Sequence, residues 1–234
     1  MWVVKLGGSL IFSPELSPWI SALTAPGNAP LVVVPGGGPF ADEVRRVQQA
    51  RCFDDAMAHR MAVLATEQYG LMLCGFSDRL VPAATALEIR DARRAGHVPV
   101  WMAGAMTRNA PDIEAGWDVS SDSLAAWLAA KLAASALILI KSAQPPERAT
   151  TAGELSRSGL VDPAFPGMVR GAAFAIRCLG PGGQPEFARA LADGLCPASQ
   201  SPPNKPQGAR DFHNGSLTMA EPWLSLGATA SKVI

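Results

Sequence analysis

Short continuous runs of apolar residues alternate along the chain with longer stretches of helical periodicity. The apolar runs are typical of strands that are buried on both faces, and the periodic stretches are typical of amphipathic helices. Strands are expected at Met1–Leu6, Leu31–Val34, Leu71–Cys74, His97–Met102, Ala136–Ile140 and Ala173–Leu179. Helices are expected at Pro39–Arg51, Asp54–Gly70, Pro82–Ala95, Ser121–Ala134 and Pro185–Ala192. This alternation predicts an α/β protein with a mostly parallel central sheet.

The character of the sequence changes after Cys196. Residues 197–210 are rich in Pro, Ser, Asn, Gln and Gly, and they show neither helical nor strand periodicity. Such a composition is typical of linkers and of segments that do not build a core. We therefore predict one folded domain at residues 1–196, followed by a linker and tail at residues 197–234.

The overall charge excludes several classes of partner. Twenty Lys and Arg residues balance twenty Asp and Glu residues among the 234, so no basic field favours nucleic acid or a membrane surface.

The three histidines are scattered and the four cysteines form no C-x-x-C pair, so the sequence predicts no metal site. The cysteines are expected to be reduced thiols, as in the cytoplasm. No apolar run approaches the roughly 20 residues of a membrane span. We expect a soluble, cytoplasmic protein.

Two glycine-rich segments, Gly7-Gly8-Ser9 and Gly36-Gly37-Gly38, each follow an expected strand. Glycine lets backbone N–H groups converge on an anion, and on neighbouring parallel strands the two segments would meet at the carboxyl edge of the sheet. A phosphate donor and a phosphate acceptor require such an arrangement. Neither segment has the spacing of the dinucleotide-binding or P-loop fingerprints, which disfavours Rossmann oxidoreductases and P-loop NTPases. Lys5, two residues before Gly7, would direct its ammonium group to the same edge.

These segments and a third one resemble the motifs of the amino acid kinase superfamily. Residues 3–10 (VVKLGGSL) are similar to its opening motif, residues 32–39 (VVVPGGGP) to its second glycine loop, and residues 121–126 (SDSLAA) to its third motif. The resemblance implies an α/β/α sandwich that transfers the γ-phosphate of ATP, bound with Mg²⁺, to an anionic acceptor. It implies that Lys5 is catalytic and that Asp122 orients it. It also implies donor contacts for Gly7, Gly8, Ser9, Ser121 and Ser123, and acceptor contacts for Gly36, Gly37 and Gly38.

A narrower resemblance involves residues 53–65 (FDDAMAHRMAVLA) and 116–123 (GWDVSSDS). They are similar to the kinases of aminomethylfuran phosphate, which act in methanofuran biosynthesis and one-carbon metabolism. The acceptor of that branch, [5-(aminomethyl)furan-3-yl]methyl phosphate, carries a phosphate and a primary amine, and the product is a diphosphate.

Several polar side chains are compatible with such an acceptor. Asp55, His59 and Thr66 share one helical face, where a carboxylate could meet the amine and His59 or Arg60 could meet the phosphate. Trp117 and Asp118 could line the same pocket. The alternative interpretations are that His59 is an ordinary hydrogen-bonded helix residue and that Asp118 caps a helix.

Three features depart from the superfamily pattern. Residues 141–143 (KSA) stand where many members carry an acidic Asp-Val-Asp-Gly stretch, and Lys141 could instead contact ATP phosphates. Residues 166–170 (PGMVR) resemble the segment that brings a second catalytic lysine; Gly167 and Met168 are expected to contact the nucleotide. Because no lysine is present, Arg170 is the candidate substitute. The expected terminal Gly-Thr strand is not recognisable after Leu195.

Two alternatives stay open. One is another kinase of the superfamily, acting on acetylglutamate, isopentenyl phosphate or UMP; an isoprenoid acceptor would favour an apolar face where Asp55 and His59 stand. The other is a non-catalytic nucleotide-binding or regulatory protein, suggested by the missing acidic stretch and second lysine. Retention of Lys5, the glycine loops and Asp122 argues against it. The resemblance also favours a homodimer or a higher homo-oligomer.

Overall fold

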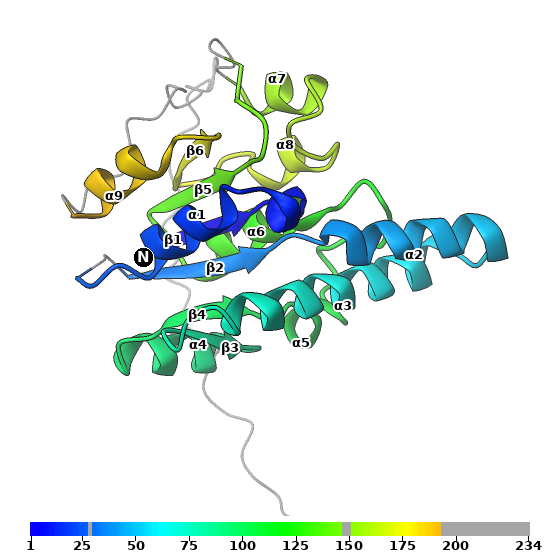
Figure 1. Cartoon of the computed structure of the whole chain (residues 1–234). Helices are drawn as coiled ribbons and strands as arrows, with labels where there is room; N and C mark the ends of the chain where they lie inside the picture. Colours follow the sequence, from blue (N-terminus) through cyan, green and yellow to red (C-terminus); the bar gives the residue numbers. More distant parts are fainter. Residues whose placement is uncertain (28–29, 147–150, 193–234) are drawn as a thin grey trace, which may run out of the picture. The chain divides into compact units, whose positions relative to one another are not determined.

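A parallel sheet of six strands forms the centre of the computed structural model, which describes residues 1–27, 30–146 and 151–192 (Figure 1). The strand order is β3-β4-β2-β1-β5-β6. Their bounds are Trp2–Leu6 (β1), Leu31–Pro35 (β2), Leu80–Ala83 (β3), Val98–Trp101 (β4), Ala136–Ile140 (β5) and Ala175–Leu179 (β6). All of these neighbours pair in parallel. The predicted α/β class with a parallel sheet is confirmed.

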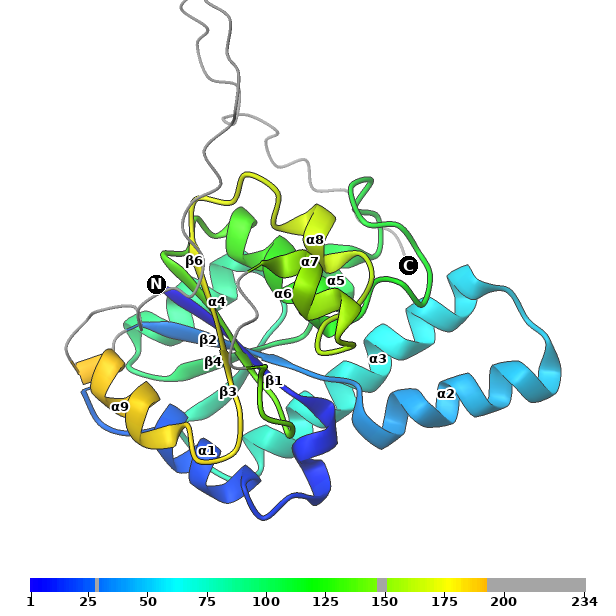
Figure 2. The ribbon, with the colours of Figure 1, turned by 90° about the horizontal axis from the view of Figure 1, so that it is seen from above.

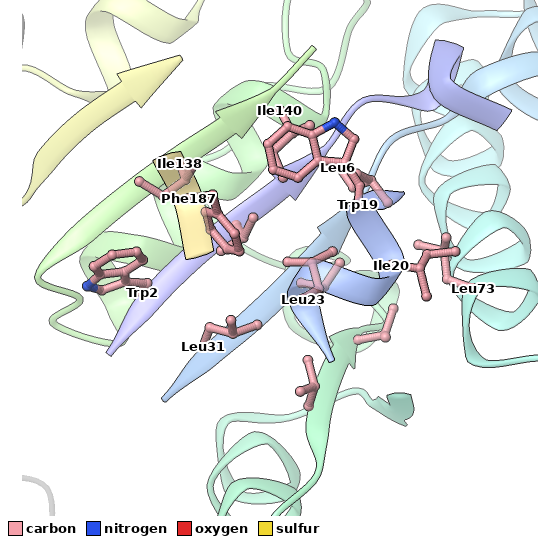
Figure 3. Packing of buried hydrophobic residues seen from close by; sticks show 14 of the residues in the cluster. Trp2, Leu6, Trp19, Ile20, Leu23, Leu31, Leu73, Ile138, Ile140 and Phe187 are labelled. Atoms are coloured by element: carbon pink, nitrogen blue, oxygen red, sulfur yellow. The ribbon is translucent and has the colours of Figure 1, made fainter. Parts of the chain in front are cut away.

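The alternation of side chains along β1 divides the core into two layers. Trp2, Val4 and Leu6 point to one face of the sheet, and Val3 and Lys5 point to the other. On the first face they pack with α1 (Leu16–Leu23), α9 (Gln184–Ala192) and the end of α3 (Asp55–Cys74). Figure 3 shows Trp19 and Phe187 in this layer, where their rings meet edge to face at 5.8 Å.

Four helices pack on the second face of the sheet. These are α4 (Ala86–Arg94), α6 (Ser121–Lys131), α7 (Ala152–Arg157) and α8 (Phe165–Met168). Helix α6 is buried along most of its length because small and apolar residues occupy nearly every position. The expected three-layer α/β/α sandwich is therefore confirmed.

Helices α2 (Gly38–Arg51) and α3 lie side by side and extend past the sheet (Figure 2). Helix α2 begins directly after β2, so its first turn stands at the carboxyl edge. Two short elements complete this edge: the 3₁₀ helix η1 (Gly8–Phe12) after β1, and α5 (Gly104–Thr107) after β4.

The strand expected at Leu71–Cys74 is wrong, because α3 continues through these residues to Cys74. Gly70 does not end the helix; it lets the helix approach the sheet. A Cβ atom at Gly70 would lie 2.9 Å from the terminal methyl carbon of Met102 and 3.1 Å from Cγ of Pro35. Tertiary packing thus decides the state of an apolar run that is short enough for either element.

The helix expected at Pro82–Ala95 is correct only from Ala86. The preceding residues form β3, and Thr85 caps α4 by accepting a hydrogen bond from the Glu88 N–H. The Glu88 carboxylate accepts from the Ala84 N–H and from the Thr85 hydroxyl, so these side chains together fix the start of the helix. The stretch expected to be rich in loops before β6 contains α7 and α8, and α1 was not predicted.

The predicted domain boundary after residue 196 and the tail at 197–234 lie outside the described residues, as does the expected terminal strand after Leu195. Among the helices of the described part, none is long and apolar enough to cross a membrane.

Candidate active site

The two glycine loops pack directly against each other at the carboxyl edge of the sheet. A Cβ atom on Gly8 would lie 2.2 Å from the backbone nitrogen of Gly38, and one on Gly36 would lie 2.3 Å from the nitrogen of Gly8. Gly38 has a φ angle of +53°, which side chains rarely adopt. The backbones can therefore meet only because these positions are glycine. The predicted neighbourhood of the two loops is confirmed.

Asp122 holds two lysine side chains beside these loops. The Nζ atom of Lys5 lies 2.9 Å from Oδ1 of Asp122. The Nζ atom of Lys141 lies 2.8 Å from Oδ1 and 2.6 Å from Oδ2 of the same carboxylate. The exposed fractions of Lys5, Asp122 and Lys141 are 5%, 4% and 9%. Two buried ammonium groups thus share one buried carboxylate, which leaves one positive charge uncompensated within the cluster.

Strand register explains how residues 136 positions apart in sequence converge on this carboxylate. Strands β1 and β5 are neighbours, and Lys5 is aligned with Leu139. Leu139 packs on the face of the sheet that α6 covers. Because side chains alternate between the two faces along a strand, Lys141, two residues later, points to the same face. Asp122 stands in the first turn of α6 and is directed at the two strand ends.

Burial and charge oppose each other at this cluster. Burial alone would raise the pKa of Asp122, but the ammonium groups of Lys5 and Lys141 outweigh it and hold the pKa below its ordinary value. Burial, and then the charge of Lys5, lower the pKa of Lys141 to about 8, although Asp122 partly offsets them. Asp122 is therefore ionised near neutral pH, and Lys141 can lose its proton in mildly alkaline solution.

A second carboxylate, Asp162, fixes the start of α6. Oδ2 of Asp162 accepts hydrogen bonds from the N–H and hydroxyl groups of Ser120 and from the N–H of Ser123. Oδ1 accepts from the Ser123 hydroxyl and from the N–H of Phe165, which begins α8. Sequence reasoning missed Asp162, and it assigned Ser123 to the nucleotide. Ser123 is fully buried and hydrogen-bonded to Asp162, so it anchors the helix that carries Asp122.

Other residues predicted to contact the nucleotide lie in two places: in the linked turns after β1 and β5, and in or just beyond α8. The hydroxyl groups of Ser9 and Ser142 are 2.7 Å apart, and the Gly7 N–H donates to the Ile140 carbonyl, so the turns after β1 and β5 are linked. Gly167 and Met168 belong to α8, where Met168 packs against the core and Gly167 is exposed. Arg170 is exposed just beyond α8. The second cation on Asp122 is contributed by Lys141.

A cavity of about 160 Å³ opens beside the start of α6. It lies between the face of α2 that follows the second glycine loop and the facing side of α3, and the segment 116–121 closes it. Its polar lining comes from both helices and that segment: Asp42, Arg45, His59, Thr66, Ser120 and Ser121. Gly37, Gly38 and Trp117 also line it. Of the residues predicted to hold the acceptor, these three and His59 are brought together here.

Arg45 is the cation that sequence reasoning missed. Its guanidinium lies 4.3 Å from the ring centre of Trp117, and its Nη1 is 3.8 Å from Oδ1 of Asp42. Gly38, Asp42 and Arg45 are spaced by four and three residues along α2, so one face of this helix could have indicated them.

The remaining predicted acceptor residues surround the cavity without lining it. Asp55 accepts from Nε2 of Gln48, whose Oε1 accepts from the indole N–H of Trp117. Asp118 accepts through its carbonyl from the Ala164 N–H, and Gly36 packs on Gly8. Nδ1 of His59 lies 3.0 Å from the Gly116 carbonyl, which holds the ring against the segment 116–121.

Sequence comparison decides the family. The profile of the amino acid kinase family matches residues 1–144, which contain both glycine loops, Lys5, Asp122 and Lys141. The chain belongs to the amino acid kinase family. The chain is also 24% identical over 131 residues to [5-(aminomethyl)furan-3-yl]methyl phosphate kinase of Methanocaldococcus jannaschii. That match covers 55% of this chain and 59% of the relative, so the chain spans about three fifths of the length of this curated relative.

Solved structures of kinases share the fold of this amino acid kinase family protein. The uridylate kinase of Archaeoglobus fulgidus superposes with a TM-score of 0.60 at 16% identity, over 83% of this chain and 96% of that chain. The UMP kinase of Ureaplasma parvum gives 0.60 at 15% identity, over 85% and 94%. An isopentenyl phosphate kinase gives 0.54 at 16% identity, over 82% and 96%. These likenesses establish the fold, and the names of the three proteins contain two different acceptors, uridylate (UMP) and isopentenyl phosphate.

Proposed function

We propose that the protein is an ATP-dependent kinase that transfers the γ-phosphate to a small anionic acceptor. One observation carries the proposal: Lys5 and Lys141 are held on Asp122 at the edge where the two glycine loops meet. A transferring phosphoryl group gathers negative charge on its equatorial oxygens, and ammonium groups that are already in place stabilise that charge without reorganisation. Family membership supports the same class of reaction.

In this mechanism the three charged residues have separate tasks. Lys5 and Lys141 would bind the phosphate oxygens, while the carboxylate of Asp122 orients both ammonium groups. Asp122 does not act as a base, because its carboxylate is occupied by the two lysines and its pKa is lowered. A phosphate-bearing acceptor is already ionised and needs no base.

The site is also compatible with a magnesium ion that arrives with ATP. Among the described residues, no three His, Cys, Asp or Glu side chains cluster as a metal site would require. Because Asp122 is engaged by the lysines, the phosphates and water would provide most of the ion's ligands, as is usual for Mg²⁺. Bound in this way, Mg²⁺ would supply additional charge neutralisation on the phosphates.

We propose [5-(aminomethyl)furan-3-yl]methyl phosphate as the acceptor, with the diphosphate as product in methanofuran-type cofactor synthesis. The cavity beside α6 supports this choice because it offers both kinds of charge. Arg45 and His59 suit a phosphate, and Asp42 suits a primary amine. The matched relative, which acts on this compound by name, supports it from sequence. A purely apolar acceptor would make no polar contact with the Asp42–Arg45 pair that lines the cavity.

We further propose that the kinase works as a cytoplasmic homodimer. Met57, Leu64 and Leu71 recur every seven residues on α3, and their exposed fractions are 47%, 51% and 57%. In an antiparallel pairing of two α3 helices, Leu64 would meet its own copy while Met57 faces Leu71, so the stripe is self-complementary about a two-fold axis. Light scattering should give a dimer for the native protein and a monomer for Leu64→Glu. Leu87→Glu, which changes an equally exposed leucine on α4, should stay dimeric.

The activity is tested by ATP consumption with Mg²⁺ against four acceptors: aminomethylfuran phosphate, isopentenyl phosphate, acetylglutamate and UMP. We expect turnover with aminomethylfuran phosphate. Turnover with a different acceptor would keep the kinase and discard the substrate. ATP binding without turnover on any of the four would favour a nucleotide-binding regulatory protein.

A further inference from the structure

A cavity lined by arginines lies at the edge of the sheet opposite the candidate active site. Its volume is about 320 Å³, and its lining includes Arg79, Arg90, Arg93, Arg94 and His97. Leu31 begins β2, Arg79 immediately precedes β3, and Val98 begins β4, so the cavity stands at the amino ends of three strands. The lysines and glycine loops stand at the carboxyl ends.

The charge around this cavity is strongly unbalanced. None of the described residues that line it is acidic, and Asp91 is the neighbouring carboxylate with ion pairs to this group. It lies 3.0 Å from Nε of Arg90 and 3.9 Å from Nη1 of Arg94. Four guanidinium groups thus line the cavity, and two of them pair with Asp91. A solvated protein surface usually disperses such charge, because like charges that gather without a counter-ion repel.

Packing holds two of the arginines in place. Nε of Arg93 is buried and, within the described part of the chain, has no hydrogen-bond partner, while its Nη1 contacts the sulfur of Met1 at 2.9 Å. Nη2 of Arg79 lies 3.5 Å from the carbonyl of Gly96. The end of α4 accounts for some of the charge, since cations are favourable at a helix C-terminus. It does not account for Arg79, which comes from a different segment.

We propose that this cavity binds a small oxyanion of two or more charges, such as a diphosphate or a polycarboxylate. Planar guanidinium groups pair with such oxygens through two parallel hydrogen bonds, and several of them converge here from α4 and from the turn before β3. The site is separate from the catalytic edge, so its ligand would not compete with ATP.

The test is calorimetric titration of the full chain with inorganic pyrophosphate and, separately, with citrate. Arg90→Gln/Arg94→Gln removes two guanidinium groups from exposed positions of α4, and we expect affinity to fall about tenfold or more, the loss of one or two charge-assisted hydrogen bonds. Arg46→Gln/Arg51→Gln removes the same charge from exposed positions of α2 and should bind as the native chain does. Tighter binding of pyrophosphate would indicate a diphosphate ligand, and tighter binding of citrate would indicate a polycarboxylate.

A third variant separates this site from the catalytic edge. Lys5→Ala should leave the arginine-dependent binding unchanged. Loss of pyrophosphate binding in Lys5→Ala alone would place the anion at the glycine loops and overturn the proposal. Equal weakening in the two arginine double variants would also overturn it, because a diffuse electrostatic effect would then explain the binding. None of these outcomes depends on the kinase activity.

Discussion

Lys141 lies two residues beyond Leu139, the register partner of Lys5 on the neighbouring strand, and both lysines contact the carboxylate of Asp122. The sheet thus holds one ammonium group at the end of each of two central strands. A pair of cations in such positions can act together on one phosphoryl group, and the buried carboxylate keeps them from separating.

Replacing either lysine should lower turnover without unfolding the protein. For Lys5→Ala and for Lys141→Met we expect kcat to fall by roughly two to three powers of ten, the effect of losing one preorganised charge-stabilising group. The remaining lysine still pairs with Asp122, so the carboxylate does not become an isolated buried charge. Steady-state kinetics with thermal unfolding as a companion measurement checks both parts.

Lys131→Met provides the matched control, since Lys131 is half exposed at the end of α6 far from Asp122, where it pairs with Asp112. It should leave kcat within about twofold, as surface ion pairs contribute little. If Lys141→Met kept nearly full activity, Lys141 would be a structural partner of Asp122 and not part of the mechanism.

The pH dependence of kcat/KM for ATP should reveal Lys141. Its pKa is lowered to about 8, mainly by burial, so the free enzyme loses this ammonium as pH rises through 8 and kcat/KM should fall there. Burial raises the pKa of the neighbouring Cys178 to about 11, so this thiol does not titrate in the same range. Lys141→Arg keeps its charge and should retain a flat profile to higher pH.

The contribution of Lys141 to stability should change in the opposite direction across this range. Between pH 8 and the ordinary lysine pKa of about 10.4, the unfolded chain holds the Lys141 proton that the folded chain has lost. The contribution of this group to the free energy of unfolding therefore rises with pH. Alkaline loss of kcat/KM without a fall in unfolding temperature would support titration at the site. An unchanged fall near pH 8 in Lys141→Arg would assign it to another group.

Asp162 should be a positioning residue whose removal weakens both the fold and the chemistry. Asp162→Ala leaves the donors of Ser120, Ser123 and Phe165 without their acceptor, and we expect a loss of about 2–4 kcal/mol in the free energy of unfolding. Because α6 carries Asp122, kcat should fall more than the KM for ATP rises. Denaturant unfolding and kinetics measure the two effects.

The comparison variant for this experiment is Asp112→Ala, which removes a half-exposed carboxylate of the turn before α6 that pairs with Lys131, the last residue of α6. It should cost about 1 kcal/mol or less. A loss in Asp162→Ala that is no larger than this would show that water replaces the carboxylate and that α6 does not depend on it.

The elements that the sequence indicates most clearly are those whose signals are local. The strands at β1, β2 and β5 are continuous apolar runs, and the glycine loops after β1 and β2 are explicit in the sequence. Leu71–Cys74 misled because a run of four apolar residues fits a strand or a helix, and the contacts of Gly70 with the sheet decide between them. Thr85, which caps α4, was a signal in the sequence for the start of that helix.

The candidate site was harder to predict from the sequence because its residues come together through strand register and helix packing. Lys5 and Asp122 stand in recognisable motifs, but the pairing of Lys141 with Asp122 requires knowing that β5 lies next to β1 and in which alignment. Asp162 follows no motif, and only the contact of α8 with α6 gives it a role. Arg170 was chosen by sequence position and lies exposed beyond α8, whereas Lys141 is the second cation that contacts Asp122.

The acceptor cavity gives the last prediction, which concerns Arg45. Its guanidinium is held over Trp117 and faces the cavity, so it is placed to bind an acceptor phosphate. Arg45→Gln should raise the KM for the acceptor about tenfold or more and change the KM for ATP little, since a charge-assisted hydrogen bond of about 1.5–3 kcal/mol is lost. Arg46→Gln is the matched control, because Arg46 is the next residue of α2 and pairs with Glu43 in solvent. If both variants raised the acceptor KM equally, general attraction by α2 would explain the effect. If neither did, the acceptor would bind elsewhere along the glycine loops.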